Sequence, residues 1–422
     1  PPRASVGRNY NGQRQGRPGR QGATRRRHRA RNGRAARNRR REQYDNGSHY
    51  DAARPPRGCP RMTWIGLACG DEAVFCPQGL DHADRAQAPR GDVLAARGAI
   101  VLEAALTPES RPQTLLGHHR PAPWRSSLSL NTLPGGGVAM VMTQGEDVIH
   151  ATVPGHLPAR GELLRITYAW DAPARQGRLS IEHPQSGFVR LAAVADPKPL
   201  PLSDLGLITR GGDAARAGGG GGLFAVSSAP EPIGPMPSLA TDAPVATADG
   251  YRPAGSLRRG DLVRGIDGHV QPVLGLLRRT VPARGGFAPV RLRAPYFGLR
   301  SDVIVAPDQR LVIAGSDVEY TFGHERVLVP ARHLVNGTAA LREPCGRTVT
   351  YVQPLLPDYD ALVVAGTPME GLFLGRLRRK PALLAASLLR DYPRAGLPEH
   401  VQSGYRVLRP YEAITLAAQR AA

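Results

Sequence analysis

Lysine is almost absent from this chain of 422 residues: Lys198 and Lys380 stand beside 54 arginines. The net charge of +21 therefore comes from arginine, and most of it lies at one end. Residues 1–58 hold seventeen arginines against three acidic residues, a net of +14, which leaves +7 for the remaining 364 residues. The basic field belongs to a tail and says little about partners of the folded part.

Long apolar runs, cysteine pairs and several enzyme motifs are also missing. No run of 18 or more apolar residues occurs, so the sequence predicts no membrane span. The four cysteines (Cys59, Cys69, Cys76 and Cys345) form no Cys-x-x-Cys pair and have no nearby His at zinc-ligand spacing, so we expect no metal or other cofactor. Cys69 and Cys76 are either ordinary thiols or a pair that forms under oxidising conditions. The chain lacks Gly-x-Ser-x-Gly and His-Glu-x-x-His, which disfavours a peptidase.

The first 58 residues have too few aliphatic side chains to bury a core, so residues 1–61 are predicted to be a disordered leader. The run Arg25–Arg29 would suit phosphate contacts, which makes nucleic acid a partner only if the leader is real. The chain begins with Pro, and Met62 opens the first segment of globular character. We therefore expect residues 1–61 to be upstream sequence translated in frame. They show no secretory signal peptide.

After a short N-terminal segment (62–97), residues 98–228 alternate short apolar strands with Gly, Pro and Asp turns, as in an antiparallel sandwich. In Leu163–Trp170, apolar residues alternate with Arg165 and Thr167, which predicts one buried face. The predicted strands are Ile100–Leu106, Ser127–Leu130, Val138–Met142, Val148–Val153, Leu163–Trp170, Gly177–Glu182, Phe188–Ala195 and Leu223–Val226.

The stretch Ile-Thr-Tyr-Ala-Trp-Asp, followed by Gly-Arg-Leu-Ser-Ile-Glu, resembles concanavalin-like (laminin-G-like) sandwiches. The resemblance implies a module that binds a glycan or a protein. Trp124 and Trp170 are the candidates for stacking on sugar rings, but core packing is the stronger expectation for both. His118 and His119 point to opposite faces of a strand, so they do not form a ligand pair.

A proline-rich linker, residues 229–237, marks the next boundary, because closely spaced prolines exclude helix and sheet. Beyond it, Ser238 opens a run with Thr-Ala-Asp-Gly at 247–250 and Leu-Arg-Arg-Gly-Asp-Leu-Val at 257–263. Further blocks follow at 302–313, 327–337 and 350–375. In this order the blocks resemble Hedgehog/intein (Hint) domains of bacterial proteins, of the Hint_2 type, which implies an all-β domain over residues 238–380.

The resemblance implies self-cleavage that starts at Ser238, whose hydroxyl would attack the preceding carbonyl and turn an amide into an ester. That step needs a proton for the departing nitrogen. The family takes it from a Thr/Ser-x-x-His block, which here reads Ala306-Pro307-Asp308-Gln309. Ala306 has no hydroxyl, and the Gln309 amide does not titrate near neutral pH. We therefore expect little or no cleavage between Pro237 and Ser238.

Other positions support the same interpretation. Gln353 and Tyr359 stand where relatives often carry His. Full splicing needs a terminal His-Asn pair, but the only Asn after residue 238 is Asn336, which Gly337 follows in a predicted turn. For the remaining histidines of the segment, such as His269, His324 and His333, we expect structural rather than catalytic roles.

The sequence thus predicts a mostly β protein: an antiparallel β-sandwich, an all-β Hint domain, and a C-terminal helix and tail over 381–422. Pro381–Tyr392 is the best helix candidate because Pro suits its first turn and Pro393 stops it. The predicted activity is at most a slow autoproteolytic N-to-O acyl shift. The alternative is a glycan- or protein-binding sandwich with the Hint domain as a scaffold. The resemblance implies a secreted or surface-associated protein, although no residue shows export.

Overall fold

The computed structural model describes residues 63–85, 93–105, 112–122, 124–134, 136–155, 163–211, 222–343, 345–401 and 404–421. The arginine-rich leader, its predicted nucleic-acid contact and Met62 lie outside the described residues. All described residues fall within one compact unit of the chain.

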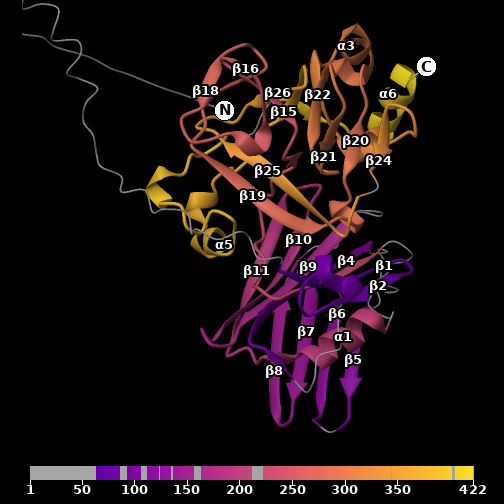
Figure 1. Cartoon of the computed structure of the whole chain (residues 1–422), viewed down its shortest axis with the longest axis vertical. Coiled ribbons are helices and arrows are strands. Elements are labelled where there is room, and N and C mark those ends of the chain that lie inside the picture. Colours follow the sequence, from indigo (N-terminus) through magenta and orange to yellow (C-terminus); the bar gives the residue numbers. More distant parts are fainter. Residues whose placement is uncertain are drawn as a thin grey trace, which may run out of the picture. The chain divides into compact units, whose positions relative to one another are not determined.

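The N-terminal part is a sandwich of two antiparallel sheets (Figure 1). In the described ranges, one sheet has the strand order β11-β10-β9-β4-β13-β1-β2 and the other the order β5-β6-β7-β8. The strands are β1 Trp64–Cys69, β2 Glu72–Phe75, β4 Arg97–Ala105, β5 Thr114–Arg120, β6 Ser126–Thr132, β7 Val138–Gln144, β8 Asp147–Val153, β9 Leu163–Asp171, β10 Gln176–His183, β11 Phe188–Ala195 and β13 Leu223–Ser227. Every strand predicted between residues 98 and 228 overlaps one of them, so the predicted sandwich is confirmed.

Short elements close the sandwich. β3 (Leu94–Ala95) pairs with β12 (Leu200–Pro201), η1 spans Leu80–Arg85, and α1 spans Leu202–Arg210. The strands β1 and β2 come from the stretch expected to be a separate segment, 62–97. They belong to the larger sheet, because β1 pairs along its length with β13.

Strand β9 departs from the prediction that one of its faces is buried. Tyr168 and Trp170 lie in the sandwich core as expected. However, Arg165 and Thr167 on the opposite face are only 5% and 2% exposed. The prediction was wrong because the C-terminal domain covers this second face, with the ring centroid of Phe287 3.8 Å from the Arg165 guanidinium carbon.

The two tryptophans singled out in the sequence have different surroundings. Trp170 is fully buried and donates from Nε1 to the Ala95 carbonyl at 2.9 Å, which confirms core packing. Trp124 is 58% exposed, so the same prediction was wrong for it. The reason is its place in the connection between β5 and β6, outside the strands of the two sheets.

The C-terminal domain contains two further sheets (Figure 1). Over the described residues their orders are β19-β25-β14-β21-β20-β24 and β18-β17-β15-β26-β27-β22-β23-β28, with β16 paired to β15. The strands are β14 Leu239–Ala240, β15 Pro244–Thr247, β16 Gly250–Pro253, β17 Leu262–Arg264, β18 Val270–Pro272, β19 Gly275–Pro282, β20 Val290–Leu292, β21 Val303–Val305, β22 Arg310–Ala314, β23 Arg326–Pro330, β24 Ala340–Arg342, β25 Thr348–Leu355, β26 Ala361–Val364, β27 Thr367–Glu370 and β28 Arg406–Val407.

Helices are few and short in this domain. They are η2 Ala254–Ser256, η3 Gly285–Phe287, η4 Tyr296–Gly298, α3 Ser316–Phe322, α4 Ala331–Leu334, η5 Leu377–Arg379, α5 Pro381–Ala385, η6 Arg394–Gly396 and α6 Pro410–Ala421. The prediction of a mostly β chain with a short C-terminal helix is confirmed. No helix in the described ranges is both long and apolar enough to span a bilayer.

The helix predicted over Pro381–Tyr392 ends early, at Ala385. Ser387 explains the difference, because its buried hydroxyl donates to the Leu384 carbonyl at 2.8 Å and accepts the Leu389 N–H at 3.1 Å. Such local side-chain bonds compete with the helical pattern. The Ala386 carbonyl is also taken, by the N–H of Ile233 in the linker at 2.9 Å.

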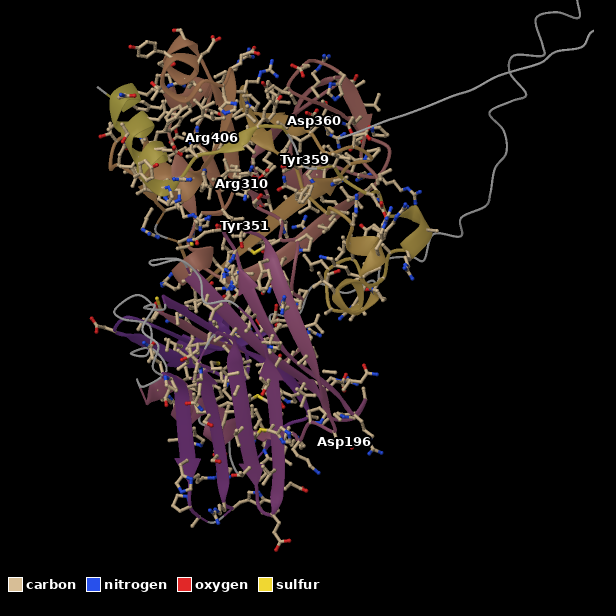
Figure 2. All side chains as sticks on the ribbon, turned by 180° about the vertical axis from the view of Figure 1, so that it is seen from behind. Asp196, Arg310, Tyr351, Tyr359, Asp360 and Arg406 are labelled. Atoms are coloured by element: carbon tan, nitrogen blue, oxygen red, sulfur yellow. The ribbon has the colours of Figure 1, made fainter. Side chains whose placement is uncertain are left out.

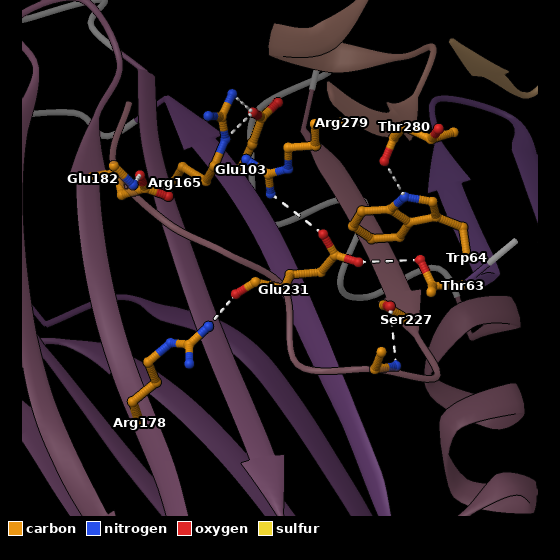
Figure 3. A network of polar contacts seen from close by, with 12 residues as sticks. Thr63, Trp64, Glu103, Arg165, Arg178, Glu182, Ser227, Glu231, Arg279 and Thr280 are labelled. Atoms are coloured by element: carbon orange, nitrogen blue, oxygen red, sulfur yellow. Dashed lines mark hydrogen bonds and ion pairs between the residues drawn. The ribbon is translucent and has the colours of Figure 1, made fainter. Parts of the chain in front are cut away.

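The sandwich and the C-terminal domain share one hydrophobic cluster. Trp64, Leu67 and Val101 of the sandwich pack in it with Phe287 and Tyr351 of the C-terminal domain. The Trp64 ring nitrogen also donates to the Thr280 carbonyl at 2.9 Å (Figure 3). A buried apolar cluster of this kind ties two domains more firmly than a polar surface contact does.

Buried charges cross the same boundary (Figure 3). Glu103 accepts from Arg165 at 2.7 Å and from the Gly286 N–H at 2.6 Å. Glu231 of the linker pairs with Arg279 of β19 at 3.5 Å, and both side chains are 6% exposed. The Glu231 carbonyl also accepts from Arg178. The linker therefore lies between the two domains and is bound to each of them.

Candidate functional site around Ser238

Ser238 lies directly before β14, a strand set between β21 and β25. Leu239 pairs with Val305 on one side and Val352 on the other, and the Ser238 carbonyl accepts the Ala306 N–H at 2.7 Å. This pairing brings Ala306 and Gln309, which follow β21, next to Ser238. The three residues singled out in the sequence therefore meet at one place.

The Ser238 hydroxyl faces two amide oxygens. Its Oγ lies 2.5 Å from Oε1 of Gln309 and 2.9 Å from Oε1 of Gln353. The amide nitrogens of both glutamines point the other way, toward the backbone carbonyl of Glu370, at 3.0 Å from Gln309 and 3.4 Å from Gln353. Because a carbonyl can only accept, it fixes both amides with their oxygens toward Ser238.

The backbone nitrogen of Ser238 meets an acceptor as well. Its N–H donates to Oε1 of Gln353 at 3.2 Å. An acyl shift at this bond would require that nitrogen to gain a proton as it leaves. An amide oxygen in contact with it offers no proton, and neither glutamine ionises near neutral pH.

Ala306 supplies only a backbone group to the site. Its side chain is buried, and its N–H is bound to the carbonyl of Ser238 rather than that of Pro237. The hydroxyl that the family pattern implies at this position is therefore missing. The Ala306 N–H is bound to the carbonyl that follows the Ser238 side chain, not to the carbonyl that the side chain would attack.

Tyr359 and Arg310, both labelled in Figure 2, contact Glu370, the residue that orients the glutamines. The Tyr359 hydroxyl donates to the Glu370 carboxylate, and Arg310 forms an ion pair with it at 3.1 Å. Arg310 also donates to the Gln185 carbonyl of the sandwich at 3.1 Å. This chain of contacts holds the β27 end in place and brings no titratable hydrogen-bond partner to Ser238.

His400 is a buried histidine on the wall of a nearby cavity. Its Nδ1 accepts the Leu374 N–H at 3.1 Å, and its Nε2 lies 3.2 Å from the Leu356 carbonyl. These partners fit the neutral ring with its proton on Nε2. Burial lowers the pKa of His400, which favours that neutral form.

The other singled-out residues lie elsewhere and have structural partners. His269 follows a hairpin turn and forms a contact of 2.9 Å with Asp360. Asn336 accepts from the N–H groups of Thr338 and Ala339 at 3.0 and 2.8 Å, with Gly337 at φ 82°, so the predicted turn is confirmed. His333 is half-buried in α4, and burial lowers its pKa.

Cys69, Cys76 and Cys345 are free thiols. Within the described ranges, no group of three or more His, Cys, Asp or Glu is placed to hold a metal ion.

Comparison with known proteins assigns the C-terminal domain to a class. A family model of the Hint domain, Hint_2, matches residues 237–376. This segment is therefore a Hint domain, and the resemblance seen in the sequence is confirmed. The match begins at Pro237, so the bond before Ser238 lies at its N-terminal edge.

Solved structures with similarity to the chain include inteins and a laminin fragment. The MchDnaB-1 intein is 13% identical with a TM-score of 0.23, covering 32% of this chain and 99% of its own. The gp41-1 intein is 9% identical with a TM-score of 0.21, covering 32% and 99%. The LG1-3 region of the laminin alpha2 chain is 12% identical with a TM-score of 0.22, covering 73% and 56%. No curated protein matches the chain.

Two features were not predicted from the sequence. Gln309, the position matched to the family's proton donor, contacts the hydroxyl of Ser238, whereas Gln353 contacts both the hydroxyl and the nitrogen. The ion pair of Glu231 was also missed, because its partner Arg279 is 48 residues away. A single charged residue within an otherwise apolar, proline-rich linker was the available hint.

Proposed function

We propose that this Hint domain has lost efficient self-cleavage and serves as a permanent scaffold for the β-sandwich that precedes it. The single observation that carries the proposal is the pair of glutamine oxygens around Ser238, which face its hydroxyl and its nitrogen. A general acid contributes about 10²–10⁴-fold to such a step. Among the described residues, the side chain that contacts the nitrogen is Gln353, which is not an acid.

The buried boundary between the domains supports the scaffold role. A Hint domain that releases its neighbour would gain nothing from a shared core, whereas here Trp64 and Phe287 are both fully buried in one cluster. The Glu103–Arg165 and Glu231–Arg279 pairs are buried in the same region. Removing the Hint domain would expose these charges and the second face of β9.

Intact-mass measurement tests the loss of cleavage. Purified full-length chain is kept at pH 7 for several days, with and without hydroxylamine, which traps an ester at Ser238. We expect no fragment that ends at Pro237 or begins at Ser238 in either sample, as in Ser238→Ala handled in parallel. Fragments that correspond to a cut between Pro237 and Ser238, absent from the alanine variant, would contradict the proposal.

Cutting the linker artificially tests the scaffold role. A protease site is inserted after Ser228, and the nicked chain is passed over a sizing column. We expect the two fragments to elute together and to separate only in denaturant, whereas separation in buffer would contradict a permanent scaffold.

A second candidate function, a glycan-binding sandwich, is favoured by one surface. On the outer face of β5–β8, none of the described positions that share the side of Ser127 and Ser129 carries Asp, Glu, Lys or Arg. Serine is depleted in protein interfaces, whereas hydroxyl groups and an exposed Trp124 suit a neutral glycan. Binding on a glycan array that Trp124→Ala abolishes would support this function; equal binding by both chains would exclude that surface.

A further inference from the structure

A cavity of about 770 Å³ lies beside the Pro237–Ser238 bond. Its walls come from the β10–β11 end of the sandwich, the linker, and the Hint-domain segments 373–383 and 399–401. Ligand sites in proteins usually measure about 300–1,000 Å³, so the cavity is large enough for a small molecule.

Most of the cavity wall is apolar. Phe188 and Val189 of β11 form one side, and Phe373, Leu377 and Leu383 form the other. Phe373 is 40% exposed, although a large aromatic side chain next to a buried core is normally covered. The cavity therefore offers an apolar surface to the tail of a ligand.

The carboxylates of the cavity wall have hydrogen-bond or ion-pair partners, whereas two of its cations have no carboxylate partner among the described residues. Each of its three carboxylates has a partner: Glu182 accepts the Gly234 N–H, Asp308 pairs with Arg332, and Glu399 pairs with Arg378 and Arg379. Two cations of the wall, Arg376 and Lys380, flank η5 and contact no carboxylate among the described residues. Since the partner of Glu182 is a neutral N–H, two cations and one carboxylate of the wall have no ion-pair partner among the described residues, and the unpaired charge of the cavity is positive.

We propose that this cavity binds an amphipathic carboxylate, a single anionic head group on an unbranched aliphatic chain. The tail would lie between β11 and the 373–383 segment, and the head group would meet Arg376 and Lys380. Arginine binds carboxylates through paired N–H groups, and an ammonium adds a point charge. The proposal does not depend on the loss of cleavage, because it uses neither Ser238 nor the two glutamines.

Calorimetric titration of the full-length chain with decanoate and with 1-decanol tests the proposal, below the concentration at which either aggregates. We expect decanoate to bind at one site per chain and at least about tenfold more tightly than decanol, the effect of a charge-assisted hydrogen bond. Arg376→Ala/Lys380→Ala should remove that difference. Arg342→Ala, at an exposed arginine of β24 outside the cavity, should leave it unchanged.

Val189→Trp provides an independent check, because the larger ring narrows the cavity. It should weaken both ligands at least about tenfold, with an unchanged far-UV circular dichroism spectrum. Equal affinity for decanoate and decanol, or no decanoate binding up to its solubility, would overturn the proposal. So would binding that survives in both the charge variant and Val189→Trp.

Discussion

The backbone N–H of Ser238 donates to the side-chain oxygen of Gln353 across 3.2 Å. In a Hint domain this nitrogen is the leaving group of the first step, and it must take up a proton as the bond breaks. In the contact found here the nitrogen donates its proton and does not receive one. The contact therefore stabilises the amide bond that would have to be cleaved. This contact supports our proposal that the domain keeps the Hint fold and has lost efficient self-cleavage.

Gln353→His should restore part of the missing chemistry, because an imidazole at this position can donate to the Ser238 nitrogen. We expect cleavage at Pro237–Ser238 to rise by at least about 10²-fold over the unchanged chain. Intact mass at intervals over one day measures it. Gln144→His, the same substitution in β7 of the sandwich, should remain uncut. A Gln353→His chain that folds and stays intact for days would show that the missing proton donor is not what limits the reaction.

Glu231→Ala should destabilise the whole folded unit. It leaves Arg279 buried at the domain boundary with its ion-pair partner removed, a change that costs about 3–5 kcal/mol when a buried pair is broken. Urea unfolding followed by tryptophan fluorescence measures the free energy of unfolding. Asp196→Ala is the matched control, because the Arg175–Asp196 pair (Figure 2 labels Asp196) is exposed and its loss should be undetectable. Equal stabilities of the two variants would contradict a stabilising role of the Glu231–Arg279 pair.

His400 should make the protein less stable in mild acid. Its folded-state pKa is lowered by burial, whereas the unfolded chain has the ordinary value near 6.5. As the pH falls through about 6.5, the unfolded state takes up a proton that the folded state resists, so stability drops until the pH reaches the folded-state pKa. His400→Asn keeps an acceptor for the Leu374 N–H and should flatten the decrease between pH 7 and 5. His119→Asn, at an exposed histidine of β5, should not flatten it.

Glu412→Ala should loosen the C-terminal helix. The Glu412 side chain accepts the N–H of Arg409, the residue before α6, at 2.8 Å and pairs with Arg406 of β28. Loss of this half of a capping box should cost about 1 kcal/mol. Glu412→Gln keeps the N–H contact and should lose less. Equal unfolding midpoints for both variants and the unchanged chain would mean that α6 does not contribute to the cooperative unit.

The sequence predicted what depends on local pattern. Alternation and turn residues located the strands, and ordered blocks indicated the Hint domain. Pairwise geometry was not predictable in this way. Ser387 shortens a segment with strong helical propensity because its hydroxyl finds two backbone partners. The alternating pattern predicts that Arg165 faces solvent, but Glu103 of the neighbouring strand β4 pairs with it and Phe287 of the C-terminal domain covers it.

In the candidate site, too, the residues of a local motif were predicted and their distant partners were not. A family pattern singled out Ser238, Ala306 and Gln309, and the structure places these three residues next to one another. The partner of the Ser238 nitrogen came from β25, 115 residues away, and its orientation depends on a backbone carbonyl of Glu370. A sequence motif specifies neither the register of a distant strand such as β25 nor the orientation of a side-chain amide such as that of Gln353.

A pulse–chase measurement from the moment of synthesis addresses the loss of self-cleavage most directly, since it counts every chain and not only those that survive purification. Chains labelled for one minute are followed at pH 7 and 25 °C by separation on denaturing gels. We predict that full-length chain persists for hours with the same decay as Ser238→Ala. Rapid appearance of one fragment that ends at Pro237 and another that begins at Ser238, in the unchanged chain only, would contradict the proposed loss of self-cleavage.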